Sequence, residues 1–368
     1  MSKRSLAVAG AVALSLLLAA CGSSSSSSSA PAASGSSSAA AKAGKVGVIL
    51  PDSASSARWE TADRKYLTEA FTAAGVESDI QNAGGDKAKF ATLCDQMINE
   101  GVKALMIVNL DSPTGAACET KAAAQGIKTI DYDRLTLGGG ATYYVSFDNV
   151  AVGTAQGEGL VKCLQDAGTK TGGIVLLNGS PTDNNATLFK QGYEAAIKAA
   201  GYSIVADQSV PDWDNTKAGT IFEQIYTAQA GKFVGVDAAN DGLGGAVIAV
   251  LAKNNLAGKI PVTGQDATDE GLQRVLLGTQ CMTVYKAIKK EADAGAALAV
   301  ALAKGETPTV AGTVKDSQTG KEVASQLLVP QPIFADSVKD VVADGFTTAD
   351  KLCTTADLKA ACTKYGVS

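Results

Sequence analysis

The sequence feature that most constrains the fold is a recurring order of strand, helix and glycine. A short apolar run at residues 45–50 is followed by an amphipathic segment at 58–74, and Gly75 comes directly after it. A glycine just past the last turn is a common way for a helix to end. The same order returns about every 25 to 30 residues, with strands expected at 77–81, 104–108 and 128–131 and helices at 86–100 and 113–125. Strands that alternate with helices in this way predict a parallel sheet with right-handed crossovers.

The same pattern starts again after residue 149. Helices are expected at 150–165, 185–200, 215–228, 242–254, 269–277 and 286–304, and strands at 173–177, 202–205, 233–236, 260–263 and 281–284. We therefore predict an α/β protein with two doubly wound (Rossmann-like) lobes of comparable size, joined near Asp148 and Asn149. A cleft between two such lobes is the natural place for a ligand.

The N-terminal residues have the order of a targeting segment. Lys3 and Arg4 precede an apolar run at 5–18, and small residues then lead to Cys21. This order resembles a bacterial lipoprotein signal, which implies a signal peptide at 1–20 and a lipid on Cys21. The alternative is an ordinary secretory signal with a chance cysteine. The Ser/Ala-rich stretch at 21–44 cannot bury a core and is expected to be a linker. We expect no membrane-spanning segment after the signal, and a protein anchored on the outer face of the cell membrane.

The composition excludes several classes of function. The chain has no histidine, which removes Ser-His-Asp catalysis and histidine-bound metals, and its net charge of −5 makes nucleic acid an unsuitable partner. The cysteines form no CxxC pair, so a zinc site is not expected. Asp212 and Asp214 could open a calcium loop, but the acidic spacing does not continue. We expect neither a metal nor a cofactor.

An acidic and a basic side chain follow the strand expected at 128–131. Asp133 and Arg134 stand where an open α/β sheet binds its ligands, beyond the carboxyl end of a strand. Together they offer an acceptor and a fork of donors to one small polar molecule. The alternative is a weak surface ion pair. Asp131 lies deeper in the strand, and we leave it out of the predicted site.

Seven short motifs follow one another along the chain, each just past a strand end or at a crossing between lobes. They are Arg58-Trp59, Tyr132-Asp133-Arg134, Ser146-Phe147-Asp148-Asn149, the stretch 179–186 (GSPTDNNA), Asn240-Asp241, Gly264-Gln265-Asp266-Ala267 and Met282-Thr283-Val284-Tyr285-Lys286. In these motifs, residues 45 to about 346 resemble the type I periplasmic sugar-binding proteins of ABC importers, and most closely their D-xylose-binding branch. One departure is that the segment 58–64 is one residue longer than the family pattern, which leaves the roles of Asp63 and Arg64 open.

The resemblance implies a type I periplasmic-binding-protein architecture with three chain crossings between the lobes. They are expected near Asp148, near Val284-Tyr285 and near Leu327-Leu328, and they form a three-stranded hinge. The N-terminal lobe then comprises residues 45–147 plus 285–325, and the C-terminal lobe 148–284 plus 326–346. The tail at 347–368 has no counterpart in the family pattern.

Within this resemblance we expect a sugar site in the cleft between the lobes. Sugar hydroxyls donate and accept hydrogen bonds, so charged and amide side chains suit them, and the ring faces suit aromatic surfaces. The expected site residues are Arg58, Trp59, Asp133, Arg134, Asn184, Asn185, Trp213, Asn240, Asp266 and Lys286.

Each of these residues also has a purely structural alternative. The two tryptophans could be core residues, and Lys286 could be a solvated surface charge. Asn184 or Asn185 could cap a helix, as could Asp241 beside Asn240, and Asp266.

Six cysteines follow Cys21, and six cysteines allow 15 disulfide connectivities. In the fold that the resemblance implies, Cys94 and Cys118 lie on adjacent helices, and Cys163 and Cys281 lie in the same lobe. Cys353 and Cys362 are close in sequence in the tail. We expect disulfides for these three pairs.

The sequence therefore favours a monomeric, non-enzymatic receptor that captures a monosaccharide, D-xylose first, and delivers it to an ABC permease by hinge bending. The alternatives are binding of glucose or another monosaccharide, and a sensory co-receptor for a membrane kinase. A carbohydrate hydrolase using Asp133 and Asp266 is disfavoured because nearby arginine and lysine lower the pKa of a would-be acid. Sugar-responsive repressors share the two-lobed fold, but they carry a DNA-binding helix-turn-helix where this chain has a signal.

Overall fold

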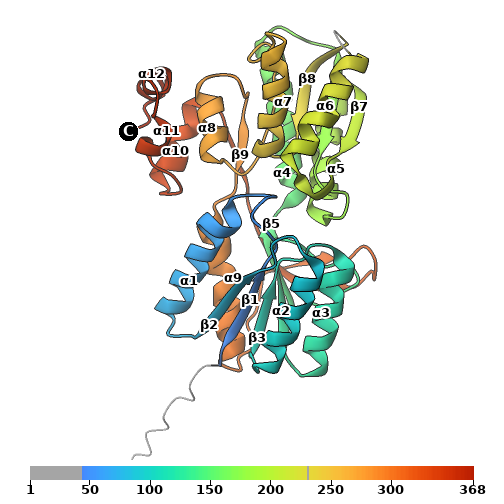
Figure 1. Cartoon of the computed structure of the whole chain (residues 1–368), viewed down its shortest axis with the longest axis vertical. Helices are drawn as coiled ribbons and strands as arrows, with labels where there is room; N and C mark the ends of the chain where they lie inside the picture. Colours follow the sequence, from blue (N-terminus) through green and yellow to red (C-terminus); the bar gives the residue numbers. More distant parts are fainter. Residues whose placement is uncertain (1–43, 230–231) are drawn as a thin grey trace, which may run out of the picture. The chain divides into compact units, whose positions relative to one another are not determined.

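The computed structural model describes residues 44–229 and 232–368 (Figure 1). Cys21, the expected signal peptide and nearly all of the expected linker lie outside the described residues. Within the described part, no helix is both long and apolar enough to cross a membrane.

The larger sheet has seven strands, in the order β10-β11-β5-β4-β3-β1-β2. All neighbouring strands are parallel except β10, which runs antiparallel to β11. Their bounds are β1 Val46–Leu50, β2 Ser78–Asn82, β3 Ala104–Ile107, β4 Lys128–Tyr132, β5 Tyr143–Phe147, β10 Gly312–Lys315 and β11 Glu322–Leu328. The sequence pattern predicted the first four of these strands but not β5, β10 or β11. Parallel order and covering helices confirm the predicted α/β fold class.

Helices cover both faces of this sheet (Figure 1). They are η1, a π-helix at Trp59–Asp63, α1 at Arg64–Ala73, α2 at Lys87–Asn99, α3 at Ser112–Ala124 and α9 at Ile288–Ala303. Alternate side chains of a strand point to opposite faces. Accordingly, Val48 of β1 packs in the cluster that holds α1 and α9, whereas Ile49 packs with α2 and α3.

The smaller sheet has three parallel strands, in the order β7-β6-β8. Its strands are β6 Gly173–Asn178, β7 Ser203–Ser209 and β8 Phe233–Ala238, and its helices are α4 Asn149–Asp166, α5 Asn184–Ala199, α6 Asn215–Gln229 and α7 Asp241–Lys253. The strand predicted at 260–263 is reduced to a single bridge between Val236 and Val262. Pro261 has no N–H to donate, which limits a ladder at this point. The two lobes were predicted to be of comparable size, but their sheets differ, with seven strands in one and three in the other.

The last part of the chain adds a two-stranded sheet and short helices. β9 (Thr283–Tyr285) pairs antiparallel with β12 (Gln331–Ile333), and β9 replaces the strand predicted at 281–284. The other elements are α8 at Asp269–Leu276, η3 at Ala335–Ser337, α10 at Val338–Ala343, α11 at Ala349–Leu352 and α12 at Ala356–Tyr365. The tail at 347–368, for which the sequence analysis predicted no structure, is thus mainly helical.

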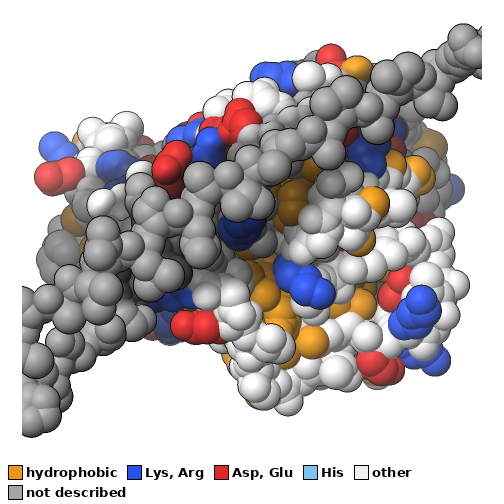
Figure 2. Space-filling view, turned by 90° about the horizontal axis from the view of Figure 1, so that it is seen from below, with side chains coloured by type: hydrophobic (Ala, Val, Ile, Leu, Met, Phe, Trp, Pro, Cys, Tyr) orange, Lys and Arg blue, Asp and Glu red, His pale blue; other side chains and the backbone are white. Residues whose placement is uncertain are grey.

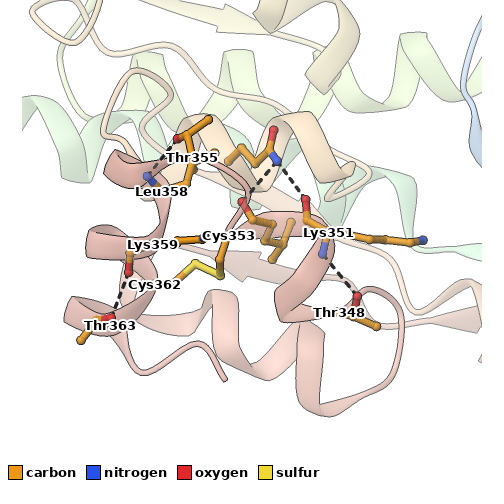
Figure 3. Close-up of a disulfide and its surroundings, with 10 residues drawn as sticks. Thr348, Lys351, Cys353, Thr355, Leu358, Lys359, Cys362 and Thr363 are labelled. Carbon is orange, nitrogen blue, oxygen red and sulfur yellow. Dashed lines mark hydrogen bonds between the residues drawn. A yellow bond between two sulfur atoms is a disulfide. The ribbon is translucent and has the colours of Figure 1, made fainter.

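The tail is held by an apolar cluster, by helix caps and by a disulfide (Figure 3). Leu352 and Leu358 pack in one buried cluster with Leu272 of α8. The Thr348 and Thr355 side chains cap α11 and α12. The disulfide between Cys353 and Cys362 then joins the two helices. We call this bond the tail disulfide.

All three predicted disulfide pairs are present. Cys94 joins Cys118, Cys163 joins Cys281 and Cys353 joins Cys362, with Cα atoms 5.9, 6.4 and 6.1 Å apart. Such bonds each stabilise a fold by about 2 to 4 kcal/mol.

Charged side chains of both signs are interspersed on the face drawn in Figure 2. Where grey atoms do not cover that face, hydrophobic side chains gather in a hollow bordered by lysine or arginine, and no continuous field of one charge is visible.

Candidate functional site

The candidate site is a pocket between the loops that follow the strands of the two sheets. The larger sheet contributes the loop after β1 and the residues after β4. The smaller sheet contributes residues after β6, β7 and β8, and Lys286 follows β9. Loops beyond the carboxyl ends of strands are where open α/β sheets bind ligands. The space left between the side chains is about 30 Å³, far below the roughly 300 Å³ at the lower end of small-molecule sites. A sugar ring can therefore enter only when these walls move apart.

Nine of the ten predicted site residues line this one pocket. They are Arg58, Trp59, Asp133, Arg134, Asn185, Trp213, Asn240, Asp266 and Lys286. Asn184 is the exception, since it is the first residue of α5, is half-buried and is not among the lining residues. The lining residues that the sequence reasoning missed are Ser55, Ser56, Asp183, Phe189 and Gln265. Asp183 and Gln265 stand inside two of the quoted motifs, so that signal was available.

Arg58 is surrounded by three carboxylates. Its Nε and Nη2 each donate to Asp63 at 2.8 Å, and its Nη1 donates to Asp133 at 2.8 Å. Nη2 also donates to Glu291 of α9 at 2.5 Å. Burial raises the pKa of Glu291 to about 8, although the positive charge of Arg58 opposes this shift. Burial also opposes ionisation of Asp133, but the positive charges of Arg58, Lys286 and Arg134 outweigh it and lower its pKa. Arg58 is thus a fixed donor in the wall of the pocket.

The extra residue in the segment 58–64 is accommodated by the π-helix at Trp59–Asp63. A π-turn holds one more residue than an α-turn, and such turns are frequent at functional sites. Asp63 is placed behind Arg58, where it also accepts a hydrogen bond from the Tyr132 hydroxyl at 2.7 Å. Arg64 instead pairs with Glu60 at 2.6 Å, away from the pocket. Asp63 therefore supports Arg58, and Arg64 forms an ion pair outside the pocket.

Asp133 and Arg134 do not form a surface ion pair. Their residues are only 4% and 7% exposed. Asp133 accepts from Asn185 Nδ2 at 3.1 Å, and Arg134 Nη1 donates to the Asn109 carbonyl at 3.2 Å. The Arg134 Nε lies 3.1 Å from an oxygen of Asp183. Asp133 is thus linked to Asn185 in the first turn of α5, and Arg134 to Asp183 just before that helix.

The helix caps around the site differ from the alternatives that the sequence left open. Asp183 caps α5 by accepting from the Asn185 N–H at 2.9 Å, so neither Asn184 nor Asn185 is the cap. Asn240, not Asp241, caps α7 by accepting from the Leu243 N–H at 2.9 Å. Thr268, not Asp266, caps α8.

The remaining charged pair in the pocket is formed by Asp266 and Lys286. Their charged atoms are 3.0 Å apart and both side chains are less than a tenth exposed. Lys286 is therefore buried, which excludes the solvated surface charge that the sequence left open.

Aromatic side chains form two walls of the pocket. The indole of Trp59 donates to Ser55 Oγ at 3.1 Å, and the indole of Trp213 donates to Asp183 at 3.1 Å. Phe189 meets the Trp213 ring edge-on, with centroids 6.5 Å apart. Gly179 lies under this ring, because a Cβ atom there would stand 2.1 Å from its Cη2. Both tryptophans are buried and line the pocket, so their core and site roles coincide.

Backbone strain is concentrated at the pocket. Among the described residues, six non-glycine positions have positive φ, and three of them, Asp133, Trp213 and Asp266, line the pocket. Two more, Asp212 and Ala267, are their sequence neighbours. Such conformations cost about 1 to 3 kcal/mol each and typically mark active sites and ligand clamps.

Three buried polar atoms of the pocket have no hydrogen-bond partner among the described residues. They are Arg134 Nε, Gln265 Oε1 and Asp266 Oδ1, one donor and two acceptors. The nearby carboxylate of Asp183 and the ammonium of Lys286 attract two of them electrostatically without the alignment of a hydrogen bond. An unpaired buried polar atom costs about 1 to 3 kcal/mol, so a ligand that donates to Gln265 Oε1, which no ion pair reaches, gains that free energy.

Comparison with known proteins agrees with this architecture. The periplasmic binding protein domain family matches residues 46–307. The chain therefore belongs to the periplasmic binding protein family, as the motifs predicted.

Individual relatives cover most of the chain. It is 34% identical over 317 residues to the D-xylose-binding periplasmic protein of Escherichia coli strain K12, across 85% of this chain and 93% of that one. It is 31% identical to a multiple sugar-binding periplasmic receptor of Rhizobium radiobacter, across 85% of this chain and 93% of that one. A solved carbohydrate transporter solute binding protein of Chloroflexus aurantiacus, in complex with D-glucose, is 28% identical, with a TM-score of 0.76 over 83% of this chain and 97% of that one.

Proposed function

We propose that this protein captures a monosaccharide, D-xylose first, between its two lobes and delivers it to an ABC importer. The observation that carries the proposal is the set of three buried atoms without a hydrogen-bond partner, on Arg134, Gln265 and Asp266. Sugar hydroxyls donate and accept at once, so one sugar can satisfy a buried donor and two buried acceptors. The indoles of Trp59 and Trp213 supply flat apolar surface for the faces of the ring.

The choice of D-xylose rests on relatives, and glucose is its main competitor. A relative that is similar over 85% of this chain is named for binding D-xylose, whereas two solved neighbours hold D-glucose. Isothermal titration calorimetry with D-xylose, glucose, ribose, arabinose and galactose tests this. We expect one site per chain with the lowest Kd for D-xylose, and the absence of heat with every sugar would refute the assignment.

The proposed capture mechanism is hinge bending at the three predicted crossings. Lys286 lines the sugar pocket, whereas its neighbours Tyr285 and Ala287 line a separate cavity together with Phe147 and Leu328. Alternate residues of an extended segment point to opposite sides. This segment therefore separates the pocket from a cavity on its other side, as a hinge strand should. Small-angle X-ray scattering should show a smaller radius of gyration when sugar is added, and an unchanged curve at saturating sugar would speak against closure.

The proposed attachment to the membrane is a lipid on Cys21, after export and removal of residues 1–20. The support is the sequence Leu18-Ala19-Ala20-Cys21 with its tether of serine and alanine. Replacing Cys21 with serine should move the protein from the membrane fraction to the soluble exported fraction. Retention of that variant on membranes would show that another feature anchors it.

A further inference from the structure

A second cavity adjoins the sugar pocket. Its volume is about 340 Å³, which falls in the range of about 300 to 1,000 Å³ typical of small-molecule sites. One wall is the loop after β1, and the other is formed by the first residues of α6, α7 and α8. Four residues line both spaces: Ser55, Ser56, Asn240 and Asp266.

Two long hydrogen bonds separate the two spaces. Ser56 Oγ donates to Asp266 Oδ2 at 3.3 Å, and Asn240 Nδ2 donates to the Ser55 carbonyl at 3.4 Å. Both distances exceed the usual range for their kind of bond. Each bond joins the loop after β1 to a residue near the smaller sheet. A hydroxyl or glycosidic oxygen on a ring in the first pocket can replace these contacts, and a substituent can then extend into the second cavity.

The walls of the second cavity offer unpaired polar groups. The side chains of Ser53, Asn215 and Glu270 line it, are exposed to solvent and have no hydrogen bond or salt bridge to another described residue. Arg274 also lines it, but its Nη2 donates to the Asp241 carbonyl at 2.6 Å and its Nε to Gln280 at 3.0 Å. The available groups are therefore a hydroxyl, an amide and a carboxylate, which suit a polyhydroxylated ligand.

No free cationic side chain lines this cavity among the described residues. The cationic residue in its lining, Arg274, already donates to the Asp241 carbonyl and to Gln280, and Asp266 is paired with Lys286. A phosphate or a uronate would therefore meet the unpaired Glu270 carboxylate without a cationic partner, so a neutral group suits the cavity better.

We propose that the second cavity is a subsite for a neutral sugar unit linked to the monosaccharide in the first pocket. The protein would then bind short oligosaccharides, such as disaccharides, as well as free monosaccharides. This inference rests on the proposed sugar-binding function.

Calorimetry with matched pairs of sugars tests the subsite. The pairs are D-xylose with 1,4-β-xylobiose and D-glucose with cellobiose. For the pair whose monosaccharide binds, the disaccharide should bind one to one, with a Kd within about tenfold of the monosaccharide. Glu270→Ala and Asn215→Ala should each weaken the disaccharide at least fivefold, by loss of a hydrogen bond, and change the monosaccharide less than twofold. Glu194→Ala, at a half-buried position on α5 that pairs with Lys198 and lines neither space, is the control and should change neither.

A third variant keeps the test independent of those two side chains. Ala54→Trp places a large ring from the exposed loop into the second cavity, and it should abolish disaccharide binding while monosaccharide binding persists. The subsite is refuted if a monosaccharide binds but its disaccharide does not, if the variants leave the disaccharide unaffected, or if glucose 6-phosphate binds as tightly as cellobiose. Absence of binding by every sugar would overturn the proposed function itself and the subsite with it.

Discussion

Arg134→Ala is the substitution that best separates sugar binding from folding. The Arg134 side chain reaches the pocket from just beyond β4, and its Nε is a buried donor without a hydrogen-bond partner. Nη2 has only a long contact of 3.5 Å with Ser55 Oγ. Nε, which lies 3.1 Å from Asp183 without an aligned hydrogen bond, and Nη2 can therefore still donate to sugar hydroxyls.

The expected loss follows from these two groups. A hydrogen bond to a charged partner contributes about 1.5 to 3 kcal/mol, so two contribute about 3 to 6 kcal/mol. At about 1.4 kcal/mol per tenfold change, the Kd should rise by about 10² to 10⁴. Binding would then be undetectable at ordinary protein concentrations.

The fold should survive this substitution. Asp183 loses the neighbouring charge but keeps the Trp213 indole at 3.1 Å and the Asn185 N–H at 2.9 Å. We expect a stability loss of about 1 to 3 kcal/mol, against a typical total of about 5 to 15 kcal/mol.

Calorimetry measures the binding and urea unfolding measures the stability. Arg64→Ala is the matched control, because Arg64 is a helical arginine that pairs with Glu60 outside the pocket, and it should bind sugar as the wild type does. If Arg134→Ala binds within fivefold of the wild type, Arg134 does not hold the sugar, and if the variant is unfolded at 25 °C, the argument from Asp183 is wrong.

Three further substitutions test the site, a buried acid and the tail. Gly179→Ala should displace the Trp213 ring, because the new Cβ would lie about 2.1 Å from it. Sugar binding should then weaken at least tenfold in calorimetry. Gly219→Ala, with open space around it, is the control, and equal binding by the two variants would contradict the proposed ring position. Burial raises the pKa of Asp237 to about 8, so the folded protein keeps a proton that the unfolded chain loses above about pH 4, and this contribution to stability falls as the pH rises toward 8. Relative to the wild type, Asp237→Asn should therefore become more stable as the pH rises from 5 to 8, by about 1.4 kcal/mol per pH unit or up to about 4 kcal/mol in all. Urea unfolding at pH 5 and at pH 8 measures this, and a difference in urea midpoint between variant and wild type that is the same at both pH values would contradict it. Replacing both cysteines of the tail disulfide with serine should lower the free energy of unfolding by about 2 to 3 kcal/mol. Hydrogen exchange in α11 and α12 should become faster, while the sugar affinity stays unchanged. Exchange rates equal to those of the wild type would show that the bond does not hold the tail.

The fold was predictable where a local sequence pattern indicates each helix and strand. Strand, helix and glycine recur through the first four strands of the larger sheet, and each element there is within about two residues of its expected position. β10 and β11 were missed because their burial is only partial. β10 pairs with β11, and the other partner of β11 is β5, which is distant in sequence. The position of β11 in the sheet therefore depends on a pairing that no short window of sequence contains.

The lining of the candidate pocket was predictable where motifs follow strand ends, as for the Asp133-Arg134 pair and the two tryptophans. The misses have a different cause. Asp183 and Asn184 are adjacent acceptors at the start of α5, and only the cap geometry shows that Asp183 faces the pocket. Phe189 lies one turn into that helix, where an apolar residue is expected in any core. The support of Arg58 by Glu291 joins residues 233 apart, which only the tertiary fold brings together.

A crystal structure of the complex with D-xylose tests the central claim most directly, because it locates the sugar. We expect one sugar ring between Trp59 and Trp213, with its hydroxyls within about 3.2 Å of Arg134, Gln265 and Asp266. Electron density for the sugar at any other place, with these three side chains unchanged and still unpaired, would contradict the account.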